Sequence, residues 1–319
     1  MTADMHPLCL VRPAALPRGG NIALVSPSRP GDAASISRTV AYLENRGYSV
    51  VVHPQASATY HYLAGPDARR ADQVMEAFTD PDIHAIICNR GGYGSGRILD
   101  LLDYDHIRCH PKPLVGFSDS TGLQLALYAR CGLVTLSGAL GDTDLAQDPP
   151  PATTVTSLFH LLTESTPLGE IATHPDSMCL RTGSATGPLI PANLALLCSL
   201  LGTRFAPDLT DAILLVEDVW EAPYRLDRMF TQLRLAGILH QIAGLALGTF
   251  RRCFVPEEME HGPTLEEMVL DAIGTRDLPV LTGIPYGHMA NRVVLPVGTN
   301  CLLNATEHRL TLLDAAVDG

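Results

Sequence analysis

The segment Lys112–Gly132, "KPLVGFSDSTGLQLALYARCG", reads as a buried strand, a tight corner and a helix. Its first part is a short apolar run, and apolar residues then recur at helical spacing up to a glycine stop. Ser and Asp are common at such corners because their side-chain oxygens accept from free N–H groups at a helix start. A serine there can also present its hydroxyl at the carboxyl end of the strand. On this stretch alone we expect Asp119 and Ser120 to serve the helix start and favour that interpretation over a nucleophilic Ser118, because Ser120 stands where the elbow pattern G-x-S-x-G has its last Gly.

Strand-like and helix-like segments alternate on both sides of this corner. They are "NIALVSPS" (21–28), "ASISRTVAYLENRGY" (34–48), "SVVVHP" (49–54), "DARRADQVMEAFTD" (67–80), "HAIICNR" (84–90) and "LVTLSGAL" (133–140). Such alternation predicts a parallel sheet with helices on both faces. Ligands of these sheets bind at the carboxyl ends of the strands.

The pattern changes after a Pro- and Asp-rich segment that starts near residue 141. We predict an α/β protein with a parallel-sheet N-terminal domain with flanking helices (1–145), a linker with one helix (146–177) and a β-rich α/β C-terminal domain (178–319). Within the last, "SMCLRTGSATGPLI" (177–190) has the pattern of hairpin strands.

Charge and composition exclude several classes of protein. The 319 residues carry a formal net charge of −12, which argues against nucleic acid or an anionic membrane as partner. No apolar run reaches the roughly 20 residues of a membrane span, and the first residues do not resemble a signal peptide. The 8 cysteines are scattered without a CxxC pair, which favours free thiols in a reducing compartment. We therefore expect a cytoplasmic protein.

Three further segments carry polar residues directly after strand-like runs. "NRGGYGSGR" (89–97) is rich in glycines whose N–H groups could surround an anion or an oxyanion, although a flexible connection explains it equally well. Glu217 and Asp218 end the apolar run "ILLVED". The dipole of the following helix accounts for one or two of the acids near its start, but not for a carboxylate inside the end of a hydrophobic strand. His288 follows a short strand in the turn "GIPYGH".

Metal sites find little support in the sequence. His106 and His110 stand four apart, but Pro111 follows at once and argues against a helix there. "EEMEHG" (257–262) lacks the H-E-x-x-H spacing. We expect neither a metal nor another cofactor.

These segments together resemble one family. The regions 90–121, 213–233 and 283–288 look like the three signature regions of the LD-carboxypeptidases, a family of serine peptidases. The segment "GSATGPLIPANLALLCSLLGT" (183–203) is similar to the opening of the family's second domain, with Pro-Ala in place of the usual Gly-Gly. The resemblance covers nearly the whole chain.

The resemblance implies a catalytic set of Ser118 as nucleophile, His288 as general base and Glu217 as the acid that orients it. Triads are defined by geometry and not by chain order, so this order is permitted. The family also implies an oxyanion hole from the backbone N–H groups of Gly92 and Asp119. Because the nucleophile falls in the first domain and the other two in the second, we expect the site in a cleft between domains.

The function that the resemblance implies is release of terminal D-alanine from murein tetrapeptides in cell-wall recycling, by a homodimer that needs no cofactor. Candidates to bind the substrate are Arg90, Tyr93, Trp220, Arg225 and Arg292. Two alternatives remain open: an amidase acting on peptidyl or aminoacyl nucleotides, as in microcin C immunity, and an inactive muropeptide-binding protein. Trp220 stands where the family usually has a small residue, and an aromatic platform there would suit a nucleobase.

Overall fold

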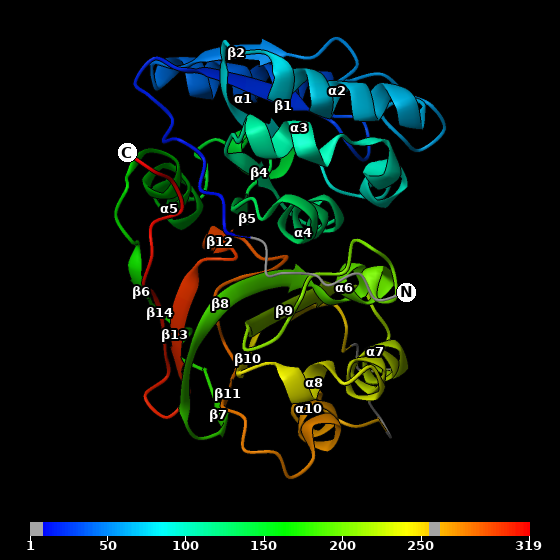
Figure 1. Cartoon of the computed structure of the whole chain (residues 1–319), viewed down its shortest axis with the longest axis vertical. Coiled ribbons are helices and arrows are strands. Elements are labelled where there is room, and N and C mark those ends of the chain that lie inside the picture. The colour runs from blue at the N-terminus through cyan, green and yellow to red at the C-terminus, as the bar shows by residue number, and fades with distance from the viewer. Residues whose placement is uncertain (1–8, 255–261) are drawn as a thin grey trace.

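The computed structural model describes residues 9–254 and 262–319, and it forms two sheets, each with its own helices (Figure 1). The predicted fold class, a parallel-sheet domain followed by a β-rich α/β domain, is confirmed. The predicted boundaries at residues 145 and 178 stay a prediction of the sequence.

The first sheet has the order β12-β5-β4-β3-β1-β2. Its strands are β1 (Asn21–Val25), β2 (Ser49–Val52), β3 (Ile83–Cys88), β4 (Leu114–Gly116), β5 (Thr135–Ser137) and β12 (Leu295–Val297). The first five are parallel, as their apolar runs predict, because strands covered by helices on both faces are buried throughout. The helices of this part are α1 (Ala33–Asn45), α2 (Asp67–Thr79), α3 (Tyr104–Cys109), α4 (Ser120–Cys131) and α5 (Ala152–Thr163), with the short 3₁₀ helix η1 (Ser95–Leu101) and the short π-helix η2 (Gly141–Leu145).

The second sheet has the order β6-β14-β13-β8-β9-β10-β11-β7. Its strands are β6 (Gly169–Ile171), β7 (Cys179–Arg181), β8 (Ser184–Asn193), β9 (Ile213–Val219), β10 (Gly244–Arg251), β11 (Val280–Leu281), β13 (Asn300–Asn304) and β14 (Arg309–Leu312). Strands β8 to β11 are parallel, and the outer strands are antiparallel. The helices of this part are α6 (Leu194–Leu200), α7 (Pro223–Leu235), α8 (Ile238–Gln241) and α10 (Leu265–Ile273).

Two local predictions were wrong. The segment 177–190 is not a hairpin: β7 pairs with β11, whereas β8 pairs with β13 and β9. Helix α3 forms in spite of Pro111, because the helix ends at Cys109 and the proline lies outside it. Proline restricts the residue before it and removes one N–H, and neither effect reaches the body of a helix that has already ended.

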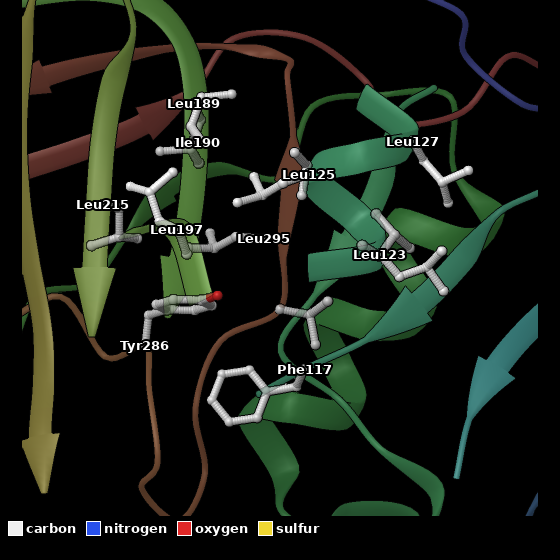
Figure 2. Packing of buried hydrophobic residues seen from close by; sticks show 14 of the residues in the cluster. Phe117, Leu123, Leu125, Leu127, Leu189, Ile190, Leu197, Leu215, Tyr286 and Leu295 are labelled. Carbon is white, nitrogen blue, oxygen red and sulfur yellow. The ribbon is translucent and has the colours of Figure 1, made fainter. Parts of the chain in front are cut away.

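The two parts of the chain are joined through β12. This strand comes late in the chain yet pairs antiparallel with β5, so the first sheet is completed by residues 295–297 (Figure 1). Side chains of both parts meet beside it. Leu125 of α4 points toward the second sheet, beside Leu197 of α6 and Leu295 of β12 (Figure 2). All three are fully buried, so one apolar core continues across both sheets.

Within the described ranges, the helices are too short or too polar for any of them to cross a lipid bilayer.

The shared core predicts that Leu125→Ala destabilises the fold by about 2–5 kcal/mol, because a buried leucine loses its apolar contacts and leaves a cavity. Urea denaturation measures the change. The matched control is Leu235→Ala, in which the same atoms are removed from a side chain that is 76% exposed; we expect a change below about 0.5 kcal/mol. Equal losses in the two variants would mean that Leu125 does not contribute to a packed core.

Candidate active site

Ser118 lies on the corner between β4 and α4 in a strained conformation. Its φ is 61°, in the left-handed region that L-residues rarely adopt. The glycine-rich segment packs directly against it: a Cβ on Gly91 would stand 2.8 Å from the Cβ of Ser118. Only glycine at position 91 therefore allows this approach, and the corner holds the hydroxyl out of the strand.

A chain of hydrogen bonds runs from Ser118 into the second part of the molecule. Its Oγ lies 3.0 Å from Nε2 of His288, and Nδ1 of the same ring lies 2.6 Å from Oε2 of Glu217. The backbone N–H of His288 donates to the same carboxylate oxygen, at 3.1 Å. Glu217 thus fixes both the ring and the backbone of the histidine. The structure brings together three residues that lie far apart in the sequence.

Glu217 is fully buried near the end of β9. Its second oxygen, Oε1, accepts from Nδ2 of Asn193 at 3.1 Å. Gly287 lies close enough that a Cβ there would stand 3.0 Å from the Cβ of Glu217. The carboxylate is therefore held by donors on each oxygen and by glycine backbone beside it, as a buried charge requires.

Asp119 takes the N-cap position of α4 and Ser120 is the first residue of the helix, as expected, but the Asp119 side chain makes no capping hydrogen bond, so a side-chain cap was wrongly expected. Its carboxylate instead accepts from the Ser28 hydroxyl (2.5 Å) and from the backbone N–H of Ser95 (2.7 Å). The Ser95 hydroxyl in turn donates to the Asp119 carbonyl oxygen. Asp119 thereby ties the serine corner to the loop after β1 and to the start of η1, directly after the glycine-rich segment.

Two backbone donors remain available beside the serine. Within residues 9–254 and 262–319, the N–H groups of Gly92 and Asp119 donate to no protein acceptor. Gly92 has φ 109°, which suits glycine, and the side chain of Arg29 lies against it. Free donors next to a hydroxyl are what an oxyanion requires.

A second carboxylate, Asp218, shares the amide of Asn193 with Glu217. It accepts from Asn193 Nδ2 (3.0 Å), from Ala195 N (2.9 Å) and from Val219 N (2.8 Å). Burial raises the pKa of Asp218 to about 6, the negative charge of Glu217 acts in the same direction, and the hydrogen bonds act against it. The strand end thus holds two buried acids, of which one contacts the histidine.

Arg292 anchors the segment that carries His288. Its guanidinium pairs with Asp144, donates to the carbonyl oxygens of Gly138 and Met289, and lies 4.1 Å from the centre of the Phe117 ring. The side chain is 7% exposed and that of Asp144 is 2% exposed, so the pair is buried. Burial raises the pKa of Asp144, and the charge of Arg292 opposes this shift.

Two pockets adjoin the serine. The Arg90 pocket, about 360 Å³, is also lined by Phe117, Leu140 and Arg292. The Trp220 pocket, about 440 Å³, is also lined by Val219 and Arg252. The walls of both include Arg29, Gly92, Ser118, Arg251 and His288.

The predicted substrate-binding residues separate into two groups. Arg90, Trp220 and Arg292 line one pocket or the other. Arg225 pairs with Glu221 at 3.4 Å and is not part of either wall. Tyr93 is half exposed, with its ring 5.8 Å from that of Tyr62, and it lines neither pocket.

Sequence reasoning missed Arg29, Arg251, Arg252 and Asn193. The arginines follow β1 and lie at the end of β10, so the rule that sites form at carboxyl ends of strands could have found them. Asn193 ends β8 directly before α6 and gave the same signal.

No three His, Cys, Asp or Glu side chains of the described ranges are grouped so that they could hold a metal ion. The acids and the histidine of residues 257–261 lie outside these ranges.

The chain matches two family models, the LD-carboxypeptidase N-terminal domain over residues 22–138 and the LD-carboxypeptidase C-terminal domain over residues 186–303. A Bacillus subtilis protein named "Probable murein peptide carboxypeptidase" is 34% identical over 96% of this chain and 95% of its own length. The crystal structure of muramoyltetrapeptide carboxypeptidase from Oxalobacter formigenes superposes with a TM-score of 0.82, at 31% identity over 92% of this chain and 97% of its own. The microcin C7 self-immunity protein MccF of Escherichia coli is 26% identical over 98% of both chains.

The raised pKa of Asp218 predicts a pH-dependent stability difference between the protein and its Asp218→Asn variant. The folded state holds this proton up to about pH 6, whereas the unfolded chain releases it near the ordinary value of 3.8. The native protein therefore loses stability as the pH rises from about 4 to 6 and does not regain it above. The neutral variant lacks this loss, so its unfolding free energy relative to wild type should rise by up to about 3 kcal/mol between pH 4 and 7.5.

Urea denaturation across this pH range measures the difference. Asp227→Asn, which changes an exposed aspartate on α7, is the matched control and should run parallel to wild type. If the unfolding free energy of Asp218→Asn followed that of wild type at every pH, the charged form of Asp218 would not destabilise the folded protein, contrary to this prediction.

Proposed function

This chain belongs to the LD-carboxypeptidase family, and we propose that it is a serine-type LD-carboxypeptidase that releases terminal D-alanine from murein tetrapeptides. The observation that carries the proposal is the hydrogen-bonded chain from Ser118 through His288 to Glu217. A serine hydroxyl is a poor nucleophile until a neighbouring base takes its proton, and the base must be held in one tautomer. The distances support this assignment of roles.

In the first half of the reaction, Ser118 attacks the carbonyl carbon of the bond before D-alanine while Nε2 of His288 takes its proton. Glu217 accepts from Nδ1 of the ring and stabilises the imidazolium that forms. The ring then returns the proton to the departing amine, which leaves as D-alanine. In the second half, His288 activates a water molecule that hydrolyses the acyl-serine.

The negative oxygen of the tetrahedral intermediate needs donors that are in place before the reaction starts. The N–H groups of Gly92 and Asp119 fit this role, because both are free of protein acceptors in the described part of the chain. Asp119 would contribute a second time through its carboxylate, which fixes the loops on either side.

The Arg90 pocket suits the terminal D-alanine. Arg90 is partly exposed and lies 3.6 Å from Asp142, so its guanidinium can reach a substrate carboxylate. Leu140 and Phe117 offer an apolar wall to the methyl group. Arg292 is already engaged by Asp144 and two carbonyl oxygens, and we assign it to holding the His288 segment.

Cell-wall recycling in the cytoplasm is the setting that this activity would serve, and the family resemblance leads us to expect a homodimer.

A second candidate function is hydrolysis of an aminoacyl nucleotide. It is favoured by Trp220, which is 69% exposed on the wall of a pocket that contains the serine and offers an aromatic face to a base. The likeness to the microcin immunity protein is compatible with it. A muropeptide-binding protein without activity is the third candidate, and the ordered hydrogen bonds of Ser118 and His288 argue against it.

The first test is Ser118→Ala. We expect D-alanine release from a diaminopimelate-type tetrapeptide to fall by at least about 10⁴-fold, because the nucleophile is removed. The unfolding free energy should change by less than about 1 kcal/mol. Mass spectrometry of the products, with a lysine-type tetrapeptide and an aminoacyl sulfamoyl adenosine in the same panel, measures the activity.

Ser37→Ala, on the exposed face of α1, is the matched control and should keep full activity. Turnover of the nucleotide alone by wild type would establish the second candidate instead. Tight binding of the tetrapeptide without any D-alanine release would leave only the binding protein.

The second test is Gly92→Ala. Alanine is strained at φ 109°, and its Cβ would collide with the side chain of Arg29, so the N–H of residue 92 should turn away from the serine. We expect kcat to fall by about 10²–10³-fold with little change in KM, as for loss of one oxyanion donor. Gly47→Ala, with φ 90° and open space around its Cβ, carries similar backbone strain far from the site and should leave kcat unchanged. An equal effect of both variants would mean that strain alone lowers activity.

A further inference from the structure

Two neighbouring strands end in the same unusual way beside the serine. Val219 of β9 pairs with Arg251 of β10, so the next residues, Trp220 and Arg252, lie side by side. Both adopt left-handed backbone conformations, with φ 58° and 57°. The N–H of Trp220 donates to the carbonyl oxygen of Arg251 at 3.0 Å, so the two strand ends remain paired through this bend.

The bend places the Arg252 guanidinium near the indole of Trp220, with its central carbon 5.5 Å from the ring centroid. Both residues line the Trp220 pocket, which also contains Ser118 and His288. A guanidinium above an aromatic ring keeps its in-plane N–H groups available, and these match the two oxygens of a carboxylate. Arg251, which lines both pockets, adds a second cation to the same wall.

The charge of this wall contrasts with that of the protein as a whole. The chain carries a net charge of −12, yet no ion pair among residues 9–254 and 262–319 engages Arg29, Arg251 or Arg252. Arg29 and Arg251 line both pockets. The arginines found only in the Arg90 pocket, Arg292 and Arg90, pair with Asp144 and Asp142, whereas Arg252 of the Trp220 pocket has no such partner in these ranges. In the part of the chain that the structure describes, the Trp220 pocket therefore has arginines without an ion-pair partner next to Ser118.

We propose that Arg251, Arg252 and Trp220 form a second anion-binding subsite, which takes a side-chain carboxylate of the residue that stays on the serine after D-alanine leaves. The inference rests on the proposed function and adds a substrate requirement to it. The Arg90 pocket then holds the terminal carboxylate and the Trp220 pocket holds the second one, on opposite sides of the bond that breaks. The residue that stays on the serine is the third residue of the tetrapeptide. A tetrapeptide whose third residue carries only an amine on its side chain binds less well, because the same arginines repel that positive charge.

The test compares two tetrapeptides that differ by one charge: one with diaminopimelate as third residue, and one in which the side-chain carboxylate of that residue is a primary amide. Binding is measured by calorimetry on the Ser118→Ala protein, so that it does not depend on turnover. We expect the carboxylate peptide to bind at least about tenfold more tightly, as for a charge-assisted hydrogen bond. Adding Arg252→Gln to the Ser118→Ala protein should reduce this preference to about twofold or less. The affinity for the amide peptide should stay within about twofold of its value in the Ser118→Ala protein alone.

Two further variants separate the subsite from general damage. Trp220→Ala should weaken the preference and Trp220→Phe should restore most of it, because phenylalanine keeps a ring beneath the guanidinium. Arg228→Gln, on the exposed face of α7, removes an arginine outside both pockets and should leave the preference unchanged.

The subsite proposal would be wrong if the two peptides bound equally tightly. It would also be wrong if Arg252→Gln lowered the affinity for both peptides by the same factor. D-alanine release is measured separately, on the protein that retains Ser118. Preferred binding of the carboxylate peptide without D-alanine release would contradict the proposed function while supporting the subsite. D-alanine release from both peptides at equal kcat/KM, with equal binding, would support the function and reject the subsite.

Discussion

The hydrogen bond between Ser118 and His288 joins the two sheets, and its 3.0 Å distance between Oγ and Nε2 depends on how the surrounding structure positions both residues. Neither sheet could hold this distance alone, because the serine corner belongs to one and the histidine turn leads out of the other. The turn is fixed from both ends. Before it, the Tyr286 hydroxyl lies 2.7 Å from that of Ser137 in β5, and after it the chain enters β12 and pairs with β5. Phe117 lies edge-on to Tyr286, so apolar packing accompanies the polar contacts (Figure 2).

This arrangement buries four carboxylates, and removing a charged group from water is unfavourable. Glu217, Asp218, Asp119 and Asp144 are each 2% exposed or less. A buried charge is tolerated only where donors or cations surround it, and each of the four has them. Their partners differ in kind: backbone N–H groups and an amide serve Asp218, whereas an arginine serves Asp144. Asn193 is the shared element, since it donates to Glu217 and Asp218 while its own oxygen accepts at the start of α6.

The sequence predicted what depends on local pattern and on the ends of strands. Apolar runs and helical spacing predicted the parallel first sheet, and the resemblance of several segments to one family implied Ser118, Glu217 and His288 as a catalytic set. It did not predict pairings that form between distant segments, such as β12 with β5 or β7 with β11. The short apolar runs of these strands carry no information about their partners. Asp119 shows the same limit at one residue: its local context favours a cap, but Ser28 and Ser95, brought near by the fold, compete successfully for its carboxylate.

The same limit explains why the sequence does not show which arginines have a structural role and which are available to a ligand. Arg251 ends β10 and Arg292 lies shortly before β12, both near the serine. Arg292 is buried against Asp144, whereas Arg251 is exposed on the walls of both pockets. What separates a structural arginine from one that is available to a ligand is the position of the nearest carboxylate, and the fold sets that position. The acidic body gives an anionic substrate no long-range attraction, and salt screens charges beyond about 8 Å at physiological ionic strength. Under the proposed function, recognition of such a substrate comes from contact with guanidinium groups in fixed planes, which favours selectivity among anions over rapid capture of any of them.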